Sequence, residues 1–263
     1  MIKNDILLFL ILSSVQKFSL SQVTDNEDKI RAKNTDTTLG WKKGGIISLG
    51  IAQASLTNWA AGGQSSFAVN SLVNVYAHKI MKNSVWENYL DLGYGLLNQG
   101  KLWRKTDDKL DFTSKYGQKL KKSIYLAGLV NFKTQFTDGF NYPNDSIAIS
   151  RFMTPGYLLG AIGIEYRPNN NLTAYLAPFT SKNTFVLDTT LSNQKAFGVD
   201  SSKVLRSEFG GYLRINYQVK IMENVQFQTK LEMFSNYLNN PGNIDVSWET
   251  LLSMKINKFA YQH

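Results

Sequence analysis

The chain has 263 residues, of which 43% are hydrophobic and 19% are charged, and its formal net charge is +9. Because it contains no cysteine, the sequence excludes disulfides, thiol nucleophiles, cysteine-ligated metals and the lipid-modified cysteine of a lipoprotein. A basic surplus suits either nucleic acid or an anionic membrane surface. The lysines and arginines are scattered rather than gathered in one long run, so we expect no nucleic-acid partner.

The first residues have the pattern of an export signal. Lys3 precedes an apolar segment at residues 6–15, and small residues follow just before position 22. This order predicts a cleaved signal peptide over residues 1–21, whose apolar segment is too short to span a bilayer. Residues 22–40 are polar, so they are expected to form a flexible periplasmic lead-in.

From Trp41 almost to the end of the chain, apolar and polar residues alternate in segments of about ten residues. A period of two places successive side chains on opposite faces of a strand. In residues 85–98, for example, Trp86 and Leu90 share one face while Glu87 and Asp91 share the other. Strands are predicted at residues 45–57, 66–79, 85–98, 110–120, 124–136, 156–167, 172–179, 208–219, 225–237 and 244–257.

The connections between these strands alternate in length. Short turns are expected at residues 81–84, 121–123, 168–171 and 221–224, and longer loops at residues 99–109, 137–154 and 180–206. The strands are longer than those usual in a soluble β-sandwich, which is the alternative, and match what a tilted strand needs to cross a bilayer. The prediction for residues 41–263 is therefore an all-β fold: an antiparallel transmembrane β-barrel of about 10–12 strands with short periplasmic turns and long outer loops.

Three stretches carry distinctive motifs: Trp-Lys-Lys-Gly-Gly at residues 41–45 with the Asn-Trp-Ala-Ala-Gly-Gly segment ending at residue 63, Gly-Val at residues 198–199, and the segment at residues 234–249. They resemble an uncharacterised Bacteroidota family, a domain of unknown function that is regarded as an outer-membrane β-barrel. The resemblance extends over about residues 39–259. It implies the outer-membrane compartment and no reaction. It also implies a further closing hairpin after residue 263, so we expect the last hairpin to be missing from this chain.

The face opposite the predicted lipid-facing residues carries charges of both signs. The predicted lumen-facing charges are Glu87, Asp91, Asp111, Lys115, Lys119, Lys133, Glu165, Arg214, Lys230, Glu232, Asp245, Glu249 and Lys255. Since the two signs nearly balance, we expect ion pairs that plug a small barrel. A narrow polar diffusion pore, with the same charges setting its selectivity, is the alternative.

Candidate catalytic groups are few. A barrel hydrolase would combine His78 with a serine and an acid, and Ser84 and Glu87 are within reach in the sequence. No motif predicts a metal or a cofactor, since neither histidine belongs to a paired-histidine motif. A lipid-modifying barrel enzyme is therefore the least favoured reading, and we expect no enzyme.

The expected function is that of a non-enzymatic outer-membrane β-barrel that binds or scaffolds through its long outer loops. The expected location is the outer membrane of a Gram-negative, Bacteroidota-like bacterium. Expected partners are outer-membrane lipid, lipopolysaccharide and other envelope proteins, because the positive surplus in the turns and loops would meet anionic headgroups and phosphates.

Overall fold

The computed structural model describes residues 38–56, 63–100 and 102–254, so the predicted signal peptide and nearly all of the lead-in lie outside the described residues. The described part is dominated by β-strands. They are β1 (Gly40–Ala54), β2 (Ser66–Ile80), β3 (Ser84–Gln99), β4 (Leu102–Lys121), β5 (Ile124–Thr134), β6 (Gly139–Phe140), β7 (Ala148–Ser150), β8 (Gly156–Tyr166), β9 (Leu172–Phe185), β10 (Leu205–Met222), β11 (Val225–Asn236) and β12 (Ile244–Met254). A short helix α3 (Thr189–Asn193) and a 3-10 turn η1 (Ala196–Gly198) lie between β9 and β10. Among these residues, no helix has the length and apolar content needed to cross a membrane.

Ten strands form a single antiparallel sheet in the order β1-β2-β3-β4-β5-β8-β9-β10-β11-β12, and β6 pairs with β7 in a separate hairpin. Within the sheet each strand lies beside the strand that precedes it in the chain, with no crossover. The prediction of an all-β, antiparallel architecture is therefore confirmed. In the described part of the chain, the outer edges of β1 and β12 have no strand beside them.

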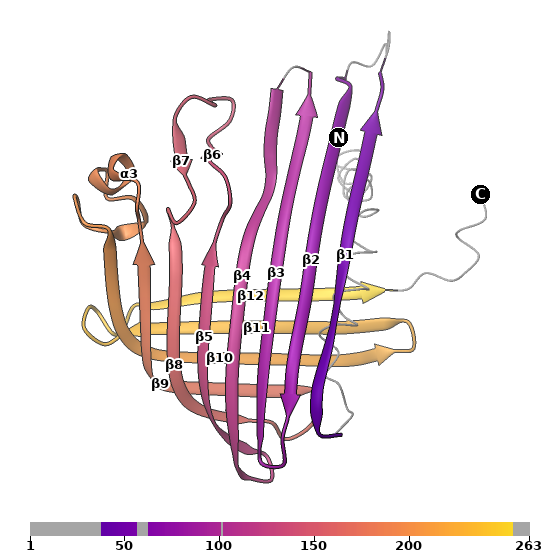
Figure 1. Ribbon diagram of the computed structural model, residues 1–263, viewed down its shortest axis with the longest axis vertical. Helices are drawn as coiled ribbons and strands as arrows, with labels where there is room; N and C mark the ends of the chain where they lie inside the picture. The colour runs from indigo at the N-terminus through magenta and orange to yellow at the C-terminus, as the bar shows by residue number, and fades with distance from the viewer. Residues whose placement is uncertain (1–37, 57–62, 101, 255–263) are drawn as a thin grey trace, which may run out of the picture.

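The sheet is strongly coiled. In Figure 1, β1–β5 run lengthwise across the front, β9 and β10 bend from lengthwise at the left to crosswise, and β11 and β12 run crosswise behind the front strands. Arg167, which follows β8, donates a hydrogen bond to Glu87 of β3, although β4 and β5 lie between these strands in the sheet. Side chains on this face thus converge. We call it the inner face and its opposite the outer face.

Aliphatic and aromatic side chains fill the middle of the inner face. The buried cluster comprises Ala127, Leu129, Ala161, Tyr175, Ala177, Tyr212 and Phe234. The hydroxyl of Tyr175 donates to the backbone oxygens of Ala127 and Ala161, at 3.2 and 3.0 Å. Its polar end is therefore paired, as a buried hydroxyl requires.

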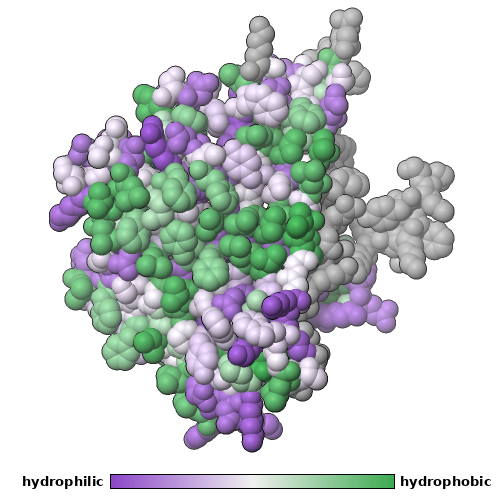
Figure 2. Space-filling view, in the orientation of Figure 1, coloured by the Kyte–Doolittle hydropathy of each residue, from purple (hydrophilic) through white to green (hydrophobic). Residues whose placement is uncertain are grey.

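The outer face is apolar and exposed. Its exposed side chains include Ile47, Leu49, Ile51, Leu126, Val130, Ile162, Ile164, Leu176, Val246, Trp248 and Leu252. Figure 2 shows hydrophobic side chains gathered across the middle of one side of the molecule, with hydrophilic ones at its lower end. This distribution is the reverse of the one expected for a sheet packed into a soluble core.

Two loop predictions need correction. The predicted loop Gln99–Lys109 is wrong, because β3 continues to Gln99 and β4 begins at Leu102. The segment is polar, but its polar side chains are paired within the sheet: Lys105 Nζ lies 2.8 Å from the Asp108 carboxylate. The predicted loop at residues 180–206 is shorter than expected, because β9 runs to Phe185 and β10 begins at Leu205.

A bulge in β9 brings its backbone so close to Gly163 of β8 that no side chain fits there. The register of β9 shifts between Leu176 and Phe179 against β8, and between Ala177 and Thr180 against β10. A Cβ atom at Gly163 would lie against the Leu176 carbonyl oxygen and the Ala177 Cα, whereas a Cβ at Gly160 would meet nothing within 4 Å.

We expect Gly163→Ala to lower the free energy of unfolding by about 1–3 kcal/mol, as overpacking does. Urea unfolding in detergent micelles, followed by tryptophan fluorescence, measures this. Gly160→Ala is the matched control, and equal effects of the two variants would contradict the prediction.

Candidate functional site

An ion-pair network lies on the inner face, near the short turns. Glu87 of β3 and Lys115 of β4 are opposite each other in the ladder. The Lys115 Nζ lies 3.0 Å from Glu87 and 2.8 Å from Glu165 of β8. Arg167 donates to both carboxylate oxygens of Glu87, at 3.1 and 2.7 Å, and to Glu165 at 2.7 Å. Two cations and two carboxylates thus alternate and cancel in charge.

The side chains of this network are buried, so breaking one of its ion pairs would affect the stability of the fold. The Glu165 side chain is 0% exposed, and the side chains of Glu87 and Arg167 are each 12% exposed. Removing one partner from a buried pair leaves an uncompensated charge, which destabilises strongly. The network therefore holds β3, β4 and β8 together at this end of the sheet.

A second cluster lies on the inner face of β10 and β11 and faces β4. On β11, Lys230 Nζ lies 3.0 Å from Glu232, and Arg214 Nε of β10 lies 3.7 Å from the same carboxylate. The Tyr212 hydroxyl also donates to Glu232. Arg214 is close enough to Asp111 of β4 for electrostatic attraction, although these strands are not neighbours in the sheet. Charges on strands that are distant in the sheet thus face one another across its inner face.

A third cluster lies toward the long loops. Lys182 of β9 lies 2.7 Å from Asp245 of β12 and 4.0 Å from Glu208 of β10. Arg206 also pairs with Glu208. The amide of Asn236 donates to the same carboxylate at 3.1 Å. This cluster connects the last four strands of the sheet through their inner face.

The structure brings most of the predicted lumen-facing charges into pairs on the inner face. Ion pairs include Glu87, Asp111, Lys115, Lys133, Glu165, Arg214, Lys230, Glu232, Asp245 and Glu249. Asp91 instead accepts a hydrogen bond from the Asn74 amide at 2.7 Å. Lys119 is exposed and forms no ion pair within the described part of the chain, and Lys255 lies outside it.

Sequence reasoning missed four members of these clusters: Arg167, Lys182, Arg206 and Glu208. A signal existed for Arg167, which lies two residues after Glu165 and so continues the same face. Lys182 and Arg206 were assigned to a loop because their surroundings are polar. Their strands extend beyond the apolar region, where the alternation weakens.

The hydrolase arrangement, which is the least favoured alternative from the sequence, does not assemble among the described residues. His78 lies between the rings of Tyr76 and Tyr89, with centroids 4.8 Å away on each side, and is opposite Glu87 in the ladder. Ser84 is three residues before Glu87 and so points to the other face, where its hydroxyl donates to Met81 Sδ at 3.6 Å. The described residues also hold no group of three or more potential metal ligands.

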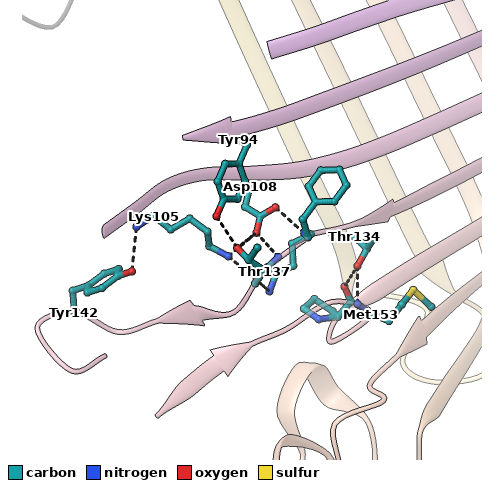
Figure 3. A network of polar contacts seen from close by, with 10 residues as sticks. Tyr94, Lys105, Asp108, Thr134, Thr137, Tyr142 and Met153 are labelled. Atoms are coloured by element: carbon teal, nitrogen blue, oxygen red, sulfur yellow. Dashed lines mark hydrogen bonds and ion pairs between the residues drawn. The ribbon is translucent and has the colours of Figure 1, made fainter. Parts of the chain in front are cut away.

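At the long-loop end, Asp108 anchors the segment at residues 135–155 (Figure 3). Its carboxylate, 2% exposed, accepts from the backbone of Phe136 at 2.7 Å and of Thr137 at 2.9 Å and pairs with Lys105. The Lys105 backbone N–H donates to the Tyr142 hydroxyl at 3.1 Å. This loop is therefore held in place by charge-assisted bonds, which are stronger than neutral ones.

The loop at residues 186–204 is ordered too. Val186, Leu191 and Val199 form a small buried core of its own. The Thr154 hydroxyl, 0% exposed as a residue, accepts from the backbone of Leu187 and Asp188 at 3.0 and 3.1 Å. That side chain joins the two long loops into one unit above the sheet.

Residues 51–140 match a family model. The family is described as "Protein of unknown function (DUF3078)". The matched region runs from β1 to β6 and contains Glu87, Lys115 and Asp108, but not Arg167. No match was found among curated proteins or among solved structures.

The buried network gives a stability prediction. Arg167→Ala leaves Lys115 alone between two carboxylates, so we expect the free energy of unfolding to fall by about 3–5 kcal/mol. Arg167→Lys keeps the charge but loses the two-pronged bond to Glu87, and its loss should be intermediate. Urea midpoints of the refolded proteins give the comparison. Lys203→Ala, which removes an exposed pair with Asp200, is the control and should be indistinguishable from the parent protein. A parent-like Arg167→Ala would refute the structural role.

Proposed function

We propose that the ten main strands close into a β-barrel without the further hairpin that the family resemblance implies. We place this barrel in the outer membrane of a Gram-negative, Bacteroidota-like bacterium, where it acts as a non-enzymatic scaffold whose ordered long loops bind a partner. One observation carries the membrane location: large apolar side chains cover the outer face. Ile47 is 79% exposed and Trp248 is 74% exposed. Monomeric soluble proteins rarely expose a continuous apolar surface of this extent, whereas lipid favours it.

Exposed aromatic side chains support the same location. Toward the short turns the outer face carries Trp41, Trp86, Tyr116, Tyr166 and Tyr217, and toward the long loops it carries Trp103, Phe136, Phe179, Phe209 and Tyr237. On β10, Phe209 and Tyr217 are about 26 Å apart along the strand, and on β4, Trp103 and Tyr116 are about 43 Å apart. At a tilt of about 45° these intervals span roughly 20–30 Å of membrane, which brackets the apolar band of about 25 Å between aromatic girdles.

The paired charges of the inner face support a scaffold rather than a pore. Three ion-pair clusters and the aromatic cluster around Tyr175 occupy the inner face along its length. In a barrel of this size, side chains are sufficient to fill the lumen. Binding is then left to the loops, and the bonds of Asp108 and Thr154 hold those loops in a defined shape. The separation of His78 from Ser84 supports a role without catalysis.

The basic surplus lies toward the short turns. Exposed lysines there are Lys82, Lys119, Lys121, Lys122 and Lys220, against one exposed acid, Glu223. This arrangement supports contact with anionic phospholipid headgroups on that side of the membrane. The long loops carry acids and bases in similar number, so contacts with lipopolysaccharide phosphates would rest on individual residues such as Lys195.

The proposed orientation places residues 186–204 outside the cell and residues 167–171 in the periplasm. Because the chain has no cysteine, single cysteines report their location cleanly. We expect a membrane-impermeant maleimide to label Gln194→Cys on intact cells and to leave Asn170→Cys unlabelled until the cells are lysed. Both native residues are exposed, so the pair is matched. The reverse labelling would invert the topology, and labelling of neither on intact cells would contradict surface exposure of the loops.

The plugged interior is tested by conductance. In planar bilayers we expect the purified protein to produce no steady unitary current, because the Glu87, Lys115, Glu165 and Arg167 side chains obstruct the lumen. Co-flotation with liposomes serves as the control that the protein has inserted. Reproducible unitary steps from inserted protein would refute the plug and favour the narrow diffusion pore.

A further inference from the structure

The two edges of the sheet form a surface that needs a partner. Among the described residues, β1 and β12 each have a neighbouring strand on one side only. An edge strand in an antiparallel sheet directs about half of its backbone N–H and C=O groups away from its neighbour. In hydrocarbon those groups have no water to bond with, so a lipid-exposed edge is not tolerated.

We propose that β1 and β12 pair with each other, antiparallel, in a register that places Ser48 opposite Glu249. The seam rests on the proposed membrane barrel and specifies which atoms close it. In Figure 1, β12 crosses behind β1 rather than running along it, so closure requires the two edges to coil further toward each other.

The ladder registers establish how the edges are staggered. Partners followed across the sheet run from Lys42 of β1 through His78, Glu87, Lys115, Leu129, Ala161, Thr180 and Gly210 to Asn236 of β11. Since Ser235 pairs with Ile244, the line leads next to Asn243. The start of β12 is therefore level with the start of β1, although the two strands run in opposite directions.

Closure of ten strands converts this stagger into a register. Ten strands about 4.8 Å apart have a circumference of about 48 Å, and a tilt of about 40° then requires an offset of about 40 Å along the strands, or about 12 residues. Applied to Lys42, that offset brings Ala54 opposite Asn243. Gln53 then lies opposite Ile244 and Lys43 opposite Met254, so the whole of β12 pairs within the bounds of β1.

The side chains favour the same register independently. On the inner face, the part of β1 that would lie beside β12 (residues 43–53) carries small residues apart from Ile46, and β12 carries polar residues apart from Leu251. The proposed register places Leu251 opposite Ile46, and it places Glu249 opposite the small side chain of Ser48. A shift by two residues in one direction places Glu249 against Ile46, and a shift in the other direction places Leu251 against Ser48.

The outer face is matched as well. Trp248 comes opposite Leu49, and Val246 comes opposite Ile51, which are aromatic–aliphatic and aliphatic pairs of the kind that stabilise neighbouring strands. All four side chains are more than half exposed on the sheet as it stands. A register shift by two residues leaves every side chain on the same face of the sheet. The registers therefore differ only in which side chains lie opposite each other.

Cysteine cross-linking in the membrane tests the register to the residue. Three double variants are compared: Ser48→Cys with Ser247→Cys, with Glu249→Cys, or with Leu251→Cys. A disulfide requires Cα atoms about 4.4–6.8 Å apart. A displacement of two residues along a strand, about 7 Å, lengthens the Cα–Cα distance to about 8–9 Å, so one variant alone should close. We expect an intrachain disulfide for Ser48→Cys with Glu249→Cys after mild oxidation, read from non-reducing gels and the mass of the linked peptide. Gln228→Cys with Leu251→Cys, which are partners in the β11–β12 ladder, is the positive control.

Every other result overturns the seam. Cross-linking of another variant indicates closure in a shifted register. Disulfide-linked dimers indicate that the edges pair with a second copy. No cross-link beside a successful control indicates that another segment occupies the seam. Gln194→Cys labelling on the same cells separates the two proposals: labelling without the expected cross-link refutes the seam alone, whereas loss of labelling refutes the proposed location.

Discussion

The fully buried carboxylate of Glu165 is the constraint on which the rest of the structure depends. A charge with no exposure to water must be surrounded by cations, and Lys115 and Arg167 meet that need at 2.8 and 2.7 Å. Arg167 in turn binds Glu87, three strands away in the sheet, where a flat sheet would leave the two backbones about 14 Å apart. Pairing these charges therefore requires the sheet to coil around its polar face.

Coiling in that direction determines which side chains of the sheet are buried and which are exposed. The inner face collects the ion pairs together with the cluster around Tyr175 and Tyr212, whose hydroxyls donate to backbone oxygens and to Glu232. The outer face is left with side chains such as Ile162 and Trp248, which are 60% and 74% exposed. A molecule with 43% hydrophobic residues, an ordinary content, thus presents much of that content outward. In the proposed membrane location, lipid covers this face, and half-apolar strands of this kind leave no mark on the overall composition.

Order in the long loops has a separate origin. Asp108 lies where β5 has ended and Thr154 lies between the loops, and each accepts two backbone hydrogen bonds from a loop segment. Val186, Leu191 and Val199 add a small apolar core. A rigid sheet that carries rigid loops is suited to presenting a fixed surface. The charges of the interior are paired mostly with one another.

The sequence by itself determined the number of main strands and the face on which most charged residues lie, because alternation is a property of the pleated backbone that each strand expresses locally. Residues 85–98 and 225–237 show it most clearly, and the structure has β3 and β11 there. Only the tertiary structure decided that Arg167 meets Glu87, that the polar segment at residues 99–109 is mostly strand, and that His78 and Ser84 point apart. Those outcomes depend on how the whole sheet coils and on how far its ladders extend past the apolar region. Both are set by the sum of pairings between residues distant in sequence, which no local pattern contains.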